Sequence, residues 1–222
     1  MTAWLYARWT PLAALFVVAA IVAGAQWVSG VPGSPPRDSL GRQQGEAVGD
    51  YLDRARTSLD GPDLGAPRWA LVSMRQRLTP AMVPDVVSGV RVSLVIFHVP
   101  AERVQTALLW QATPAGAAAL RSSAGYAART AFTNLSKRSA GTERSRQVAR
   151  FTALRLAQDC ACTAGMIVRA PLGALRSLAG RAEVRAVEAL PDGSEWLSVN
   201  PLLPEQEGTP VPEPDDGPVP PA

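Results

Sequence analysis

The sequence predicts an α+β domain, a sandwich of antiparallel strands and two helices, attached to one N-terminal apolar helix. Three observations predict it. The N-terminus contains an uncharged apolar run, two later segments repeat a strand–helix–strand pattern, and a helix-forming stretch separates the two repeats. Between the apolar run and an acidic C-terminal end, about 160 residues remain, which is enough to bury a core.

The N-terminal segment is predicted to span a membrane once. Residues 9–36 contain no charged residue, and residues 11–28 form an apolar run of about the length that a spanning helix needs, with tryptophans near both ends. Arg8 precedes the run, which favours a C-terminal domain on the extracytoplasmic side of the cell membrane. Because Ala23-Gly24-Ala25 fits a signal-peptidase site, residues 1–28 are either a retained anchor or a cleaved signal peptide.

Residues 29–42 are rich in Ser, Gly and Pro and are predicted to be a linker. The extracytoplasmic domain is then expected over residues 43–203. It begins with a helix from Gln43 to Leu59, where apolar residues recur at steps of three and four. Asp60-Gly61-Pro62 is expected to end that helix.

Two strand–helix–strand units follow, each shorter than about 35 residues. In succession they are the split βαβ pattern of a ferredoxin-like sandwich. Pro84 falls one turn inside the first expected helix, so that helix either begins after Pro80 or has a distorted first turn. The expected strands are Trp69–Met74, Val90–Val99, Thr163–Arg169 and Val184–Leu190, and the expected helices open at Thr79-Pro80 and near Pro171.

Residues 114–159 carry almost no strand signal and are predicted to form a helical hairpin inserted between the two units. Ser139-Ala140-Gly141 breaks the helical pattern, and Thr142 is a suitable N-cap for the second helix. After Trp196 the chain is expected to be extended. Residues 204–222, which are acidic and rich in proline, are predicted to be a disordered tail.

The predicted hairpin is strongly basic. From Arg121 to Arg155 it has eight basic residues and one acidic residue, Glu143, a local charge of +7. This face is either simply solvated or binds an anionic envelope polymer, lipid headgroups or an acidic protein, and the acidic tail is able to fold back onto it. Nucleic acid is not expected as a partner of an extracytoplasmic domain with few aromatic residues in this stretch. The candidate face comprises Lys137, Arg138, Arg144, Arg146 and Arg150.

Cys160 and Cys162 are the only cysteines. In an extended segment their side chains share a face about 6–7 Å apart, too far for a disulfide without a turn. An oxidising compartment favours a disulfide within the triplet or between two chains, with thiol redox chemistry and metal binding as the alternatives. His98, the single histidine, falls on the apolar face of its strand and is expected to be a hydrogen-bonded structural residue. No motif predicts a cofactor, a metal site or a hydrolase triad.

Several segments resemble a family of uncharacterised actinobacterial single-pass membrane proteins. The resemblance covers most of residues 43–204; it implies the same membrane topology and brings no activity with it. The segments are Tyr51–Arg56 with Ser58-Leu59, Arg68–Ser73, Cys160-Ala161-Cys162 and Pro201–Pro204.

Residues 164–191 are also similar to the end of subtilisin-type propeptides and inhibitors, through Met166–Val168, Leu178-Ala179 and Val184–Glu188. This resemblance implies a ferredoxin-like fold that binds a protease and places an extended C-terminal segment in its active site. In this chain no protease domain follows residue 191.

These features lead to a membrane-tethered interaction or scaffold module of the cell envelope, without an evident catalytic activity. An inhibitor or folding assistant of an envelope protease is the first alternative. A thiol redox protein that uses Cys160 and Cys162 is the second.

Overall fold

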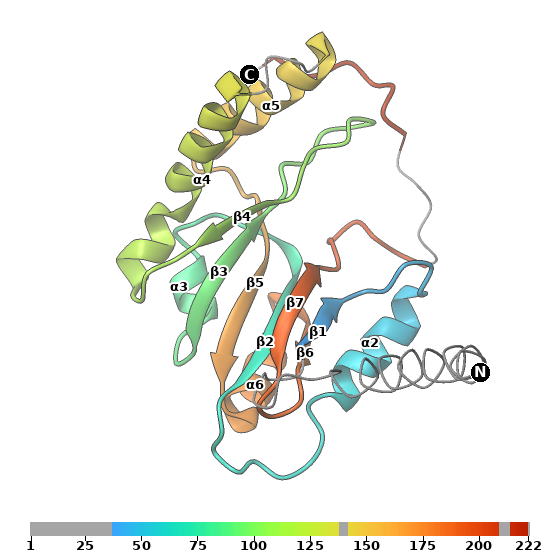
Figure 1. The fold of residues 1–222 in the computed structure, drawn as a ribbon, viewed down its shortest axis with the longest axis vertical. Helices are drawn as coiled ribbons and strands as arrows, with labels where there is room; N and C mark the ends of the chain where they lie inside the picture. Colours follow the sequence, from blue (N-terminus) through green and yellow to red (C-terminus); the bar gives the residue numbers. More distant parts are fainter. Residues whose placement is uncertain (1–36, 138–141, 209–213, 222) are drawn as a thin grey trace, which may run out of the picture. The chain divides into compact units, whose positions relative to one another are not determined.

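A computed structural model describes residues 37–137, 142–208 and 214–221, and it is a mixed α+β structure (Figure 1). One sheet has five antiparallel strands in the order β4-β3-β5-β2-β6, and a second sheet pairs β1 with β7 in parallel. The strands are β1 (Arg37–Gly41), β2 (Arg68–Leu78), β3 (Arg91–Phe97), β4 (Leu109–Ala112), β5 (Thr163–Ala170), β6 (Val184–Ala189) and β7 (Glu195–Asn200). The helices are α2 (Val48–Thr57), α3 (Val83–Val86), α4 (Ala117–Lys137), α5 (Glu143–Ala157) and α6 (Leu172–Ala179).

The predicted membrane segment, residues 1–28 with its Ala23–Ala25 triplet, lies outside the described residues. Within the residues that the structure does describe, no helix combines the length and apolar character that crossing a membrane requires. The anchor or signal peptide therefore stays a prediction.

The two strand–helix–strand units interleave in the five-stranded sheet. β5 of the second unit pairs antiparallel with both strands of the first unit, β2 and β3, and β6 pairs with the outer side of β2. Of the two alternatives for the first unit's helix, the structure shows the later start: α3 begins at Val83, after Pro80. The reason is Pro84, whose missing N–H is tolerated in a first helical turn but not one turn further in.

The main core lies on one face of this sheet. Leu172, Leu175 and Leu178 of α6 cover it together with Val83 and Val86 of α3, and all five are buried. The periodic spacing of these leucines is what makes α6 amphipathic and fixes the side that faces the sheet.

α4 and α5 occupy the stretch where the sequence predicts a helical hairpin, and they pack against each other. Thr142 caps α5 by accepting a hydrogen bond from the backbone N–H of Ser145 at 3.2 Å. α4 reaches the main core through the small residues Ala124, Ala127 and Ala128, which allow it to approach α3 and β3 closely.

The opposite face of the sheet carries the β1–β7 pair, which lies in front of it in Figure 1. Leu40 of β1 and Val199 of β7 pack there on Leu71, Ile96 and Ile167. The linker prediction for residues 29–42 is therefore wrong at its C-terminal end, since residues 37–41 form a strand. Its pairing partner lies more than 150 residues further along the chain, beyond any local signal.

The C-terminal segment also differs from the disordered tail predicted for residues 204–222. Within the described residues 204–208 and 214–221, Asp215 and Asp216 form ion pairs, and the Gly217 N–H donates to the carbonyl of Arg103 at 2.8 Å. Val219 packs against the main core. A proline-rich acidic segment cannot bury enough apolar surface on its own to offset the conformational entropy lost on ordering. These ion pairs and apolar contacts with the rest of the domain supply that stabilisation.

Candidate functional site

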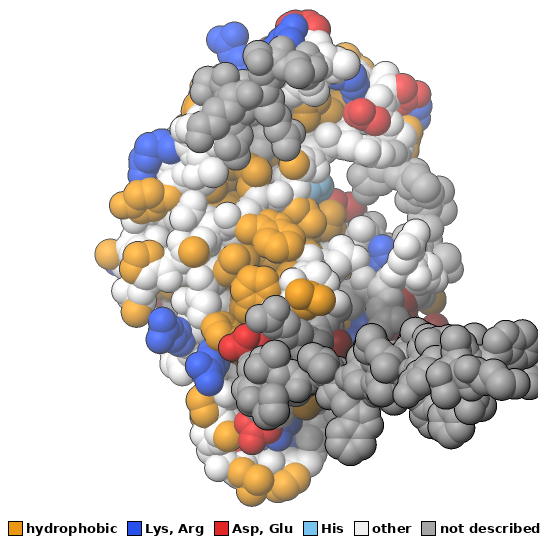
Figure 2. Space-filling view, in the orientation of Figure 1, with side chains coloured by type: hydrophobic (Ala, Val, Ile, Leu, Met, Phe, Trp, Pro, Cys, Tyr) orange, Lys and Arg blue, Asp and Glu red, His pale blue; other side chains and the backbone are white. Residues whose placement is uncertain are grey.

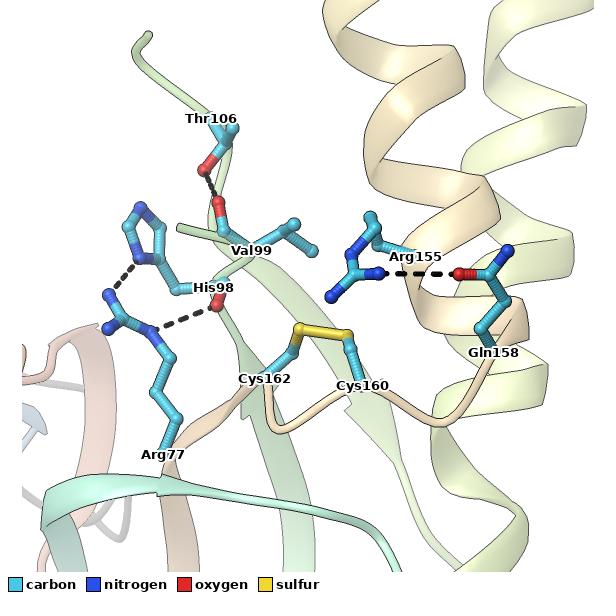
Figure 3. Close-up of a disulfide and its surroundings, with 8 residues drawn as sticks. All are labelled: Arg77, His98, Val99, Thr106, Arg155, Gln158, Cys160 and Cys162. Carbon is cyan, nitrogen blue, oxygen red and sulfur yellow. Dashed lines mark hydrogen bonds between the residues drawn. A yellow bond between two sulfur atoms is a disulfide. The ribbon is translucent and has the colours of Figure 1, made fainter. Parts of the chain in front are cut away.

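Cys160 and Cys162 form a disulfide with each other directly before β5 (Figure 3). A turn makes this possible: the Cys162 N–H donates to the Cys160 carbonyl at 2.8 Å, and Asp159 adopts a left-handed φ of 53°. The turn brings the two Cα atoms to 5.3 Å, within the range that a disulfide spans. The cystine is thus closed inside the triplet. Both residues are buried, 8% and 1% exposed, which limits attack by an external thiolate.

His98 lies beside this disulfide, directly after β3, and its backbone N–H donates to the Cys162 carbonyl at 2.9 Å. Arg77, the penultimate residue of β2, makes two contacts with it: Nη2 donates to the His98 Nδ1 at 2.6 Å, and Nε donates to the His98 carbonyl at 3.1 Å (Figure 3). Glu205 accepts from Arg77 Nη2 at 2.6 Å and completes the cluster. The three side chains border a cavity of about 390 Å³.

The charge state of this cluster argues against acid–base catalysis. Burial and the neighbouring Arg77 guanidinium lower the pKa of His98 to about 4, against a smaller opposing effect of Glu205. The ring is therefore neutral at physiological pH, and its Nδ1 lone pair is occupied by the Arg77 donor. A histidine bound in this way ties the end of β2 to the end of β3 across the intervening β5 instead of accepting a proton from a substrate.

A second buried ionic group joins the two sheets. The Glu188 carboxylate of β6 accepts from the Gly41 N–H at 2.5 Å and forms an ion pair with Arg54 of α2, which also pairs with Glu46 at 3.0 Å. Burial raises the pKa of Glu188, while the Gly41 and Arg54 hydrogen bonds act in the opposite direction. This group connects α2, β1 and β6, and its role is structural.

The predicted basic face is only partly free in the structure. Arg144 donates to the Asp215 carboxylate at 2.7 Å and to the Gly217 carbonyl at 2.8 Å, and this contact lowers the pKa of Asp215. Arg146 pairs with Glu143 one turn earlier at 2.6 Å. Arg150 is exposed on the same helix. Lys137 is the last residue of α4, and Arg138 lies outside the described residues.

A groove runs between α5 and the segment that leads into β4. It has a volume of about 430 Å³; Leu108 and Leu109 lie on one side and Val148 and Thr152 on the other. Its rim carries charge, because the Arg144–Asp215 pair borders it. Of the features on the described residues, this groove with the α5 arginines combines an apolar floor with basic groups at its edge, which suits an acidic partner segment.

The structure brings together some of the predicted site residues and separates others. The disulfide and the α5 arginines are separate sites. The disulfide lies beyond the C-terminal end of α5, whereas Arg144 and Arg146 lie in the first turn of that helix, after its N-cap Thr142. Sequence reasoning missed Arg77 and Glu205 as partners, and it allowed the acidic tail to fold onto the basic face without identifying Asp215 as the residue in contact. Alternation along β2 places Arg75 and Arg77 on one side of the strand, but nothing local links Arg77 to a carboxylate 128 residues away.

Within the described residues no three His, Cys, Asp or Glu side chains lie close enough together to hold a metal ion. Comparisons with models of protein families, with curated proteins and with solved structures found no match for this chain. The function is therefore argued from the geometry.

Proposed function

We propose that this chain is a membrane-tethered extracytoplasmic interaction module whose α4–α5 hairpin binds an anionic partner of the cell envelope. The observation that carries the proposal is the contact of Arg144 with Asp215. A carboxylate from 71 residues further along the chain lies against this guanidinium at 2.7 Å. A face that binds a carboxylate of its own chain has the charge and geometry to bind one from a partner.

The remaining arginines of the hairpin extend this face. Arg146 and Arg150 are exposed one turn apart on α5, and Arg121 and Arg129 are exposed on α4. Guanidinium groups bind carboxylate and phosphate in a bidentate manner and stay charged at every physiological pH. Such a face favours acidic protein segments or anionic polymers and gives a binding strength that falls with ionic strength.

The five-stranded sheet provides the rigid base for the hairpin. We interpret β2-α3-β3 and β5-α6-β6 as the two halves of a ferredoxin-like sandwich, with β4 added at one edge. The support is the strand order β6-β2-β5-β3, in which each unit's second strand lies outside the other unit's first strand. The hairpin is then an insertion between the halves.

The protease-inhibitor alternative has less support. An inhibitor of the propeptide type needs a free extended segment after its last core strand to enter a protease active site. In this chain that segment is β7, whose backbone pairs with β1 from Arg37↔Glu195 to Gly41↔Asn200. Inhibition of a subtilisin-type protease by the full chain at micromolar concentration would revive this alternative.

The thiol redox alternative is weakened by burial of the Cys160–Cys162 disulfide. Replacing both cysteines by serine tests it, because a redox role requires the pair, whereas a structural role affects only stability. A thiol titration that finds the pair permanently oxidised, with full function retained by the double variant, would remove this alternative.

The proposal is tested by binding of the full chain, reconstituted in phosphatidylcholine nanodiscs, to immobilised poly-glutamate. Arg146→Gln is expected to weaken binding about two- to fivefold, the effect of one exposed charge pair. Arg56→Gln is the matched control, since Arg56 forms the same i,i+3 ion pair with Asp53 on another helix.

The double variant Arg146→Gln/Arg150→Gln is expected to bind more weakly still and to show a shallower dependence on salt. Equal losses in the Arg56 control and the hairpin variants would mean that net charge alone drives binding. That result would contradict a specific role of the hairpin.

A further inference from the structure

We infer that the sheet face that carries β1 and β7 rests on the lipid surface and holds the hairpin at a fixed orientation to the membrane. The inference rests on the proposed function through its membrane tether. It adds a second contact with the bilayer, made by the folded domain itself.

The first observation is the placement of the tryptophans. All three tryptophans within the described residues, Trp69, Trp110 and Trp196, belong to this face of the molecule. Trp69 and Trp196 pack against the cluster of Leu40 and Ile96, and Trp110 lies opposite Ile96 in the β3–β4 pairing.

These side chains are not fully covered. Trp110 is 44% exposed, and Trp69, Leu94, Leu108 and Trp196 are half-buried. Leu197, which follows Trp196 on β7 at the irregularity of the β1–β7 pairing, is 64% exposed. Figure 2 shows hydrophobic side chains gathered in the centre of this face. Partly exposed apolar side chains gathered in one patch on a folded domain mark a surface that contacts a partner or a membrane.

The second observation concerns the chemistry of the patch. Tryptophan concentrates at membrane interfaces, where its ring meets the acyl-chain boundary and its N–H meets the headgroups. The Arg169 guanidinium stacks over the Trp69 ring at 5.3 Å, so a cation that suits lipid phosphate lies beside the aromatic surface. Asp38 and Glu195 are exposed at the β1–β7 end of the face, so apolar insertion, more than net charge, must supply the attraction.

The third observation is the length of the tether. Because β1 begins at Arg37, only residues 29–36 separate it from the end of the predicted membrane segment at Val28. Eight residues span at most about 28 Å when fully extended. A compact unit the size of residues 37–222 is about 40 Å across.

On the proposed membrane topology, the tether length alone limits the start of β1 to about 28 Å from the bilayer surface. The lipid surface is therefore an occupant within reach of the face that carries Trp110 and Trp196. A protein partner on this face would have to compete with the membrane at very high effective concentration.

The test uses the full chain with Trp4, Trp9 and Trp27 replaced by Phe, so that only the three domain tryptophans fluoresce. It is reconstituted in phosphatidylcholine vesicles whose lipids are brominated near the headgroup end of one acyl chain. We expect a loss of fluorescence relative to unbrominated vesicles. Leu197→Asp should reduce that loss at least about twofold, because a charge resists insertion.

Leu64→Asp is the matched control. Leu64 is 79% exposed in the loop before β2, next to Asp63, which accepts a hydrogen bond from Gly173 of α6 on the other side of the sheet. It should leave the quenching unchanged.

Flotation of the vesicles separates the two proposals. A chain that floats with the vesicles but shows no quenching would overturn the lipid-facing surface and leave the tether intact. A chain that does not float would overturn both. Tryptophans that are unquenched but become shielded as the protein-to-lipid ratio rises would assign the face to a second copy of the chain.

Discussion

Burial sets the charge state of His98, and that makes stability depend on pH. The pKa of His98 is about 4 in the folded protein and about 6.5 in the unfolded chain. Between these values the unfolded chain binds more protons, so the stabilisation that His98 contributes is present above pH 6.5 and is lost as the pH falls towards 4.

We therefore expect wild type to lose about 3 kcal/mol more than His98→Asn between pH 6.5 and pH 4. Urea unfolding measured at several pH values gives both profiles. Because the asparagine variant shares all the carboxylates, their titration cancels in the difference. Parallel profiles would show that His98 is not held neutral by its surroundings.

Arg54 is expected to matter through Glu188, because Glu188 is buried and its charge needs a partner. Arg54→Met should destabilise the fold by about 3 kcal/mol at pH 8, the usual effect of leaving a buried charge unpaired. Loss of Arg54 raises the pKa of Glu188 further, so the carboxyl becomes neutral more readily and the defect should shrink towards pH 5.

Arg56→Met is the matched control for this substitution. Arg56 lies on the same helix, and its ion pair with Asp53 is exposed, with 74% and 69% of the two side chains accessible. Thermal or urea unfolding should show little change. A defect in Arg54→Met that is equal at both pH values would contradict a buried, titrating partner.

At the residue scale, sequence reasoning identified the kind of environment but not the partners. Because His98 alternates in step with apolar residues of its strand, the sequence predicted a buried, hydrogen-bonded ring. That prediction fits its contact with Arg77. The Arg54–Glu188 pair joins residues 134 positions apart, so only the tertiary fold brings them together.

Among the elements, the β1–β7 pair depends on Gly41. This residue has a φ of +102°, and a Cβ at its position would lie 1.9 Å from the Asn200 carbonyl oxygen. Gly41→Ala should therefore separate the end of β1 from β7 and destabilise the protein by at least about 2 kcal/mol.

Hydrogen exchange at the Arg42 N–H, which donates to Asn200 at 3.1 Å, reports on this pairing directly. Gly45→Ala is the control, because Gly45 also has a positive φ, +78°, but faces open space. It should cost about 1 kcal/mol and leave Arg42 protected. Equal exchange in both variants would argue against a steric role of Gly41.

At the scale of elements, the sequence predicted the strands that carry strong apolar patterns and missed those that need a partner. β2, β3, β5 and β6 follow from β-branched and apolar runs. β1 is short and lies after a stretch rich in Gly and Pro, so its pattern reads as a linker. β4 has four residues with alternating exposure and gains its pairing only from β3.

For the whole molecule, the C-terminal segment places one of its carboxylates on the basic hairpin. Asp215 binds Arg144 of α5, so part of the basic face is already occupied by an internal anion, whereas Asp216 binds Arg103 in the segment between β3 and β4. Asp215→Asn should remove the carboxylate charge from Arg144, which keeps its hydrogen bond to the Gly217 carbonyl, and strengthen binding of the full chain to poly-glutamate about two- to fivefold at low salt.

The control for that variant is Glu207→Gln, which removes the same charge from an exposed position of the C-terminal segment. It should raise affinity less than Asp215→Asn. Binding assays at two salt concentrations separate the local contact from the general change in net charge. An equal gain in the two variants would mean that the Arg144–Asp215 contact has no special role.

The opposite charges of the hairpin and the C-terminal end were visible in the sequence, and folding back of the acidic end was one of the interpretations they allowed. Composition could not decide which arginine forms an ion pair with which acidic residue. That choice depends on the hydrogen bonds that Asp215 and Gly217 form with Gln105 and Arg103 before β4, and on the packing of Val219 against the main core.

The central claim is that the α5 arginines recognise a partner at the membrane surface. Its most direct test is affinity purification of the full chain from native membranes, comparing wild type, Arg146→Gln/Arg150→Gln and Arg56→Gln by quantitative mass spectrometry. We predict one set of components that co-purifies with wild type and with the Arg56 variant and is depleted with the α5 variant. An identical set of components with all three proteins would contradict the claim.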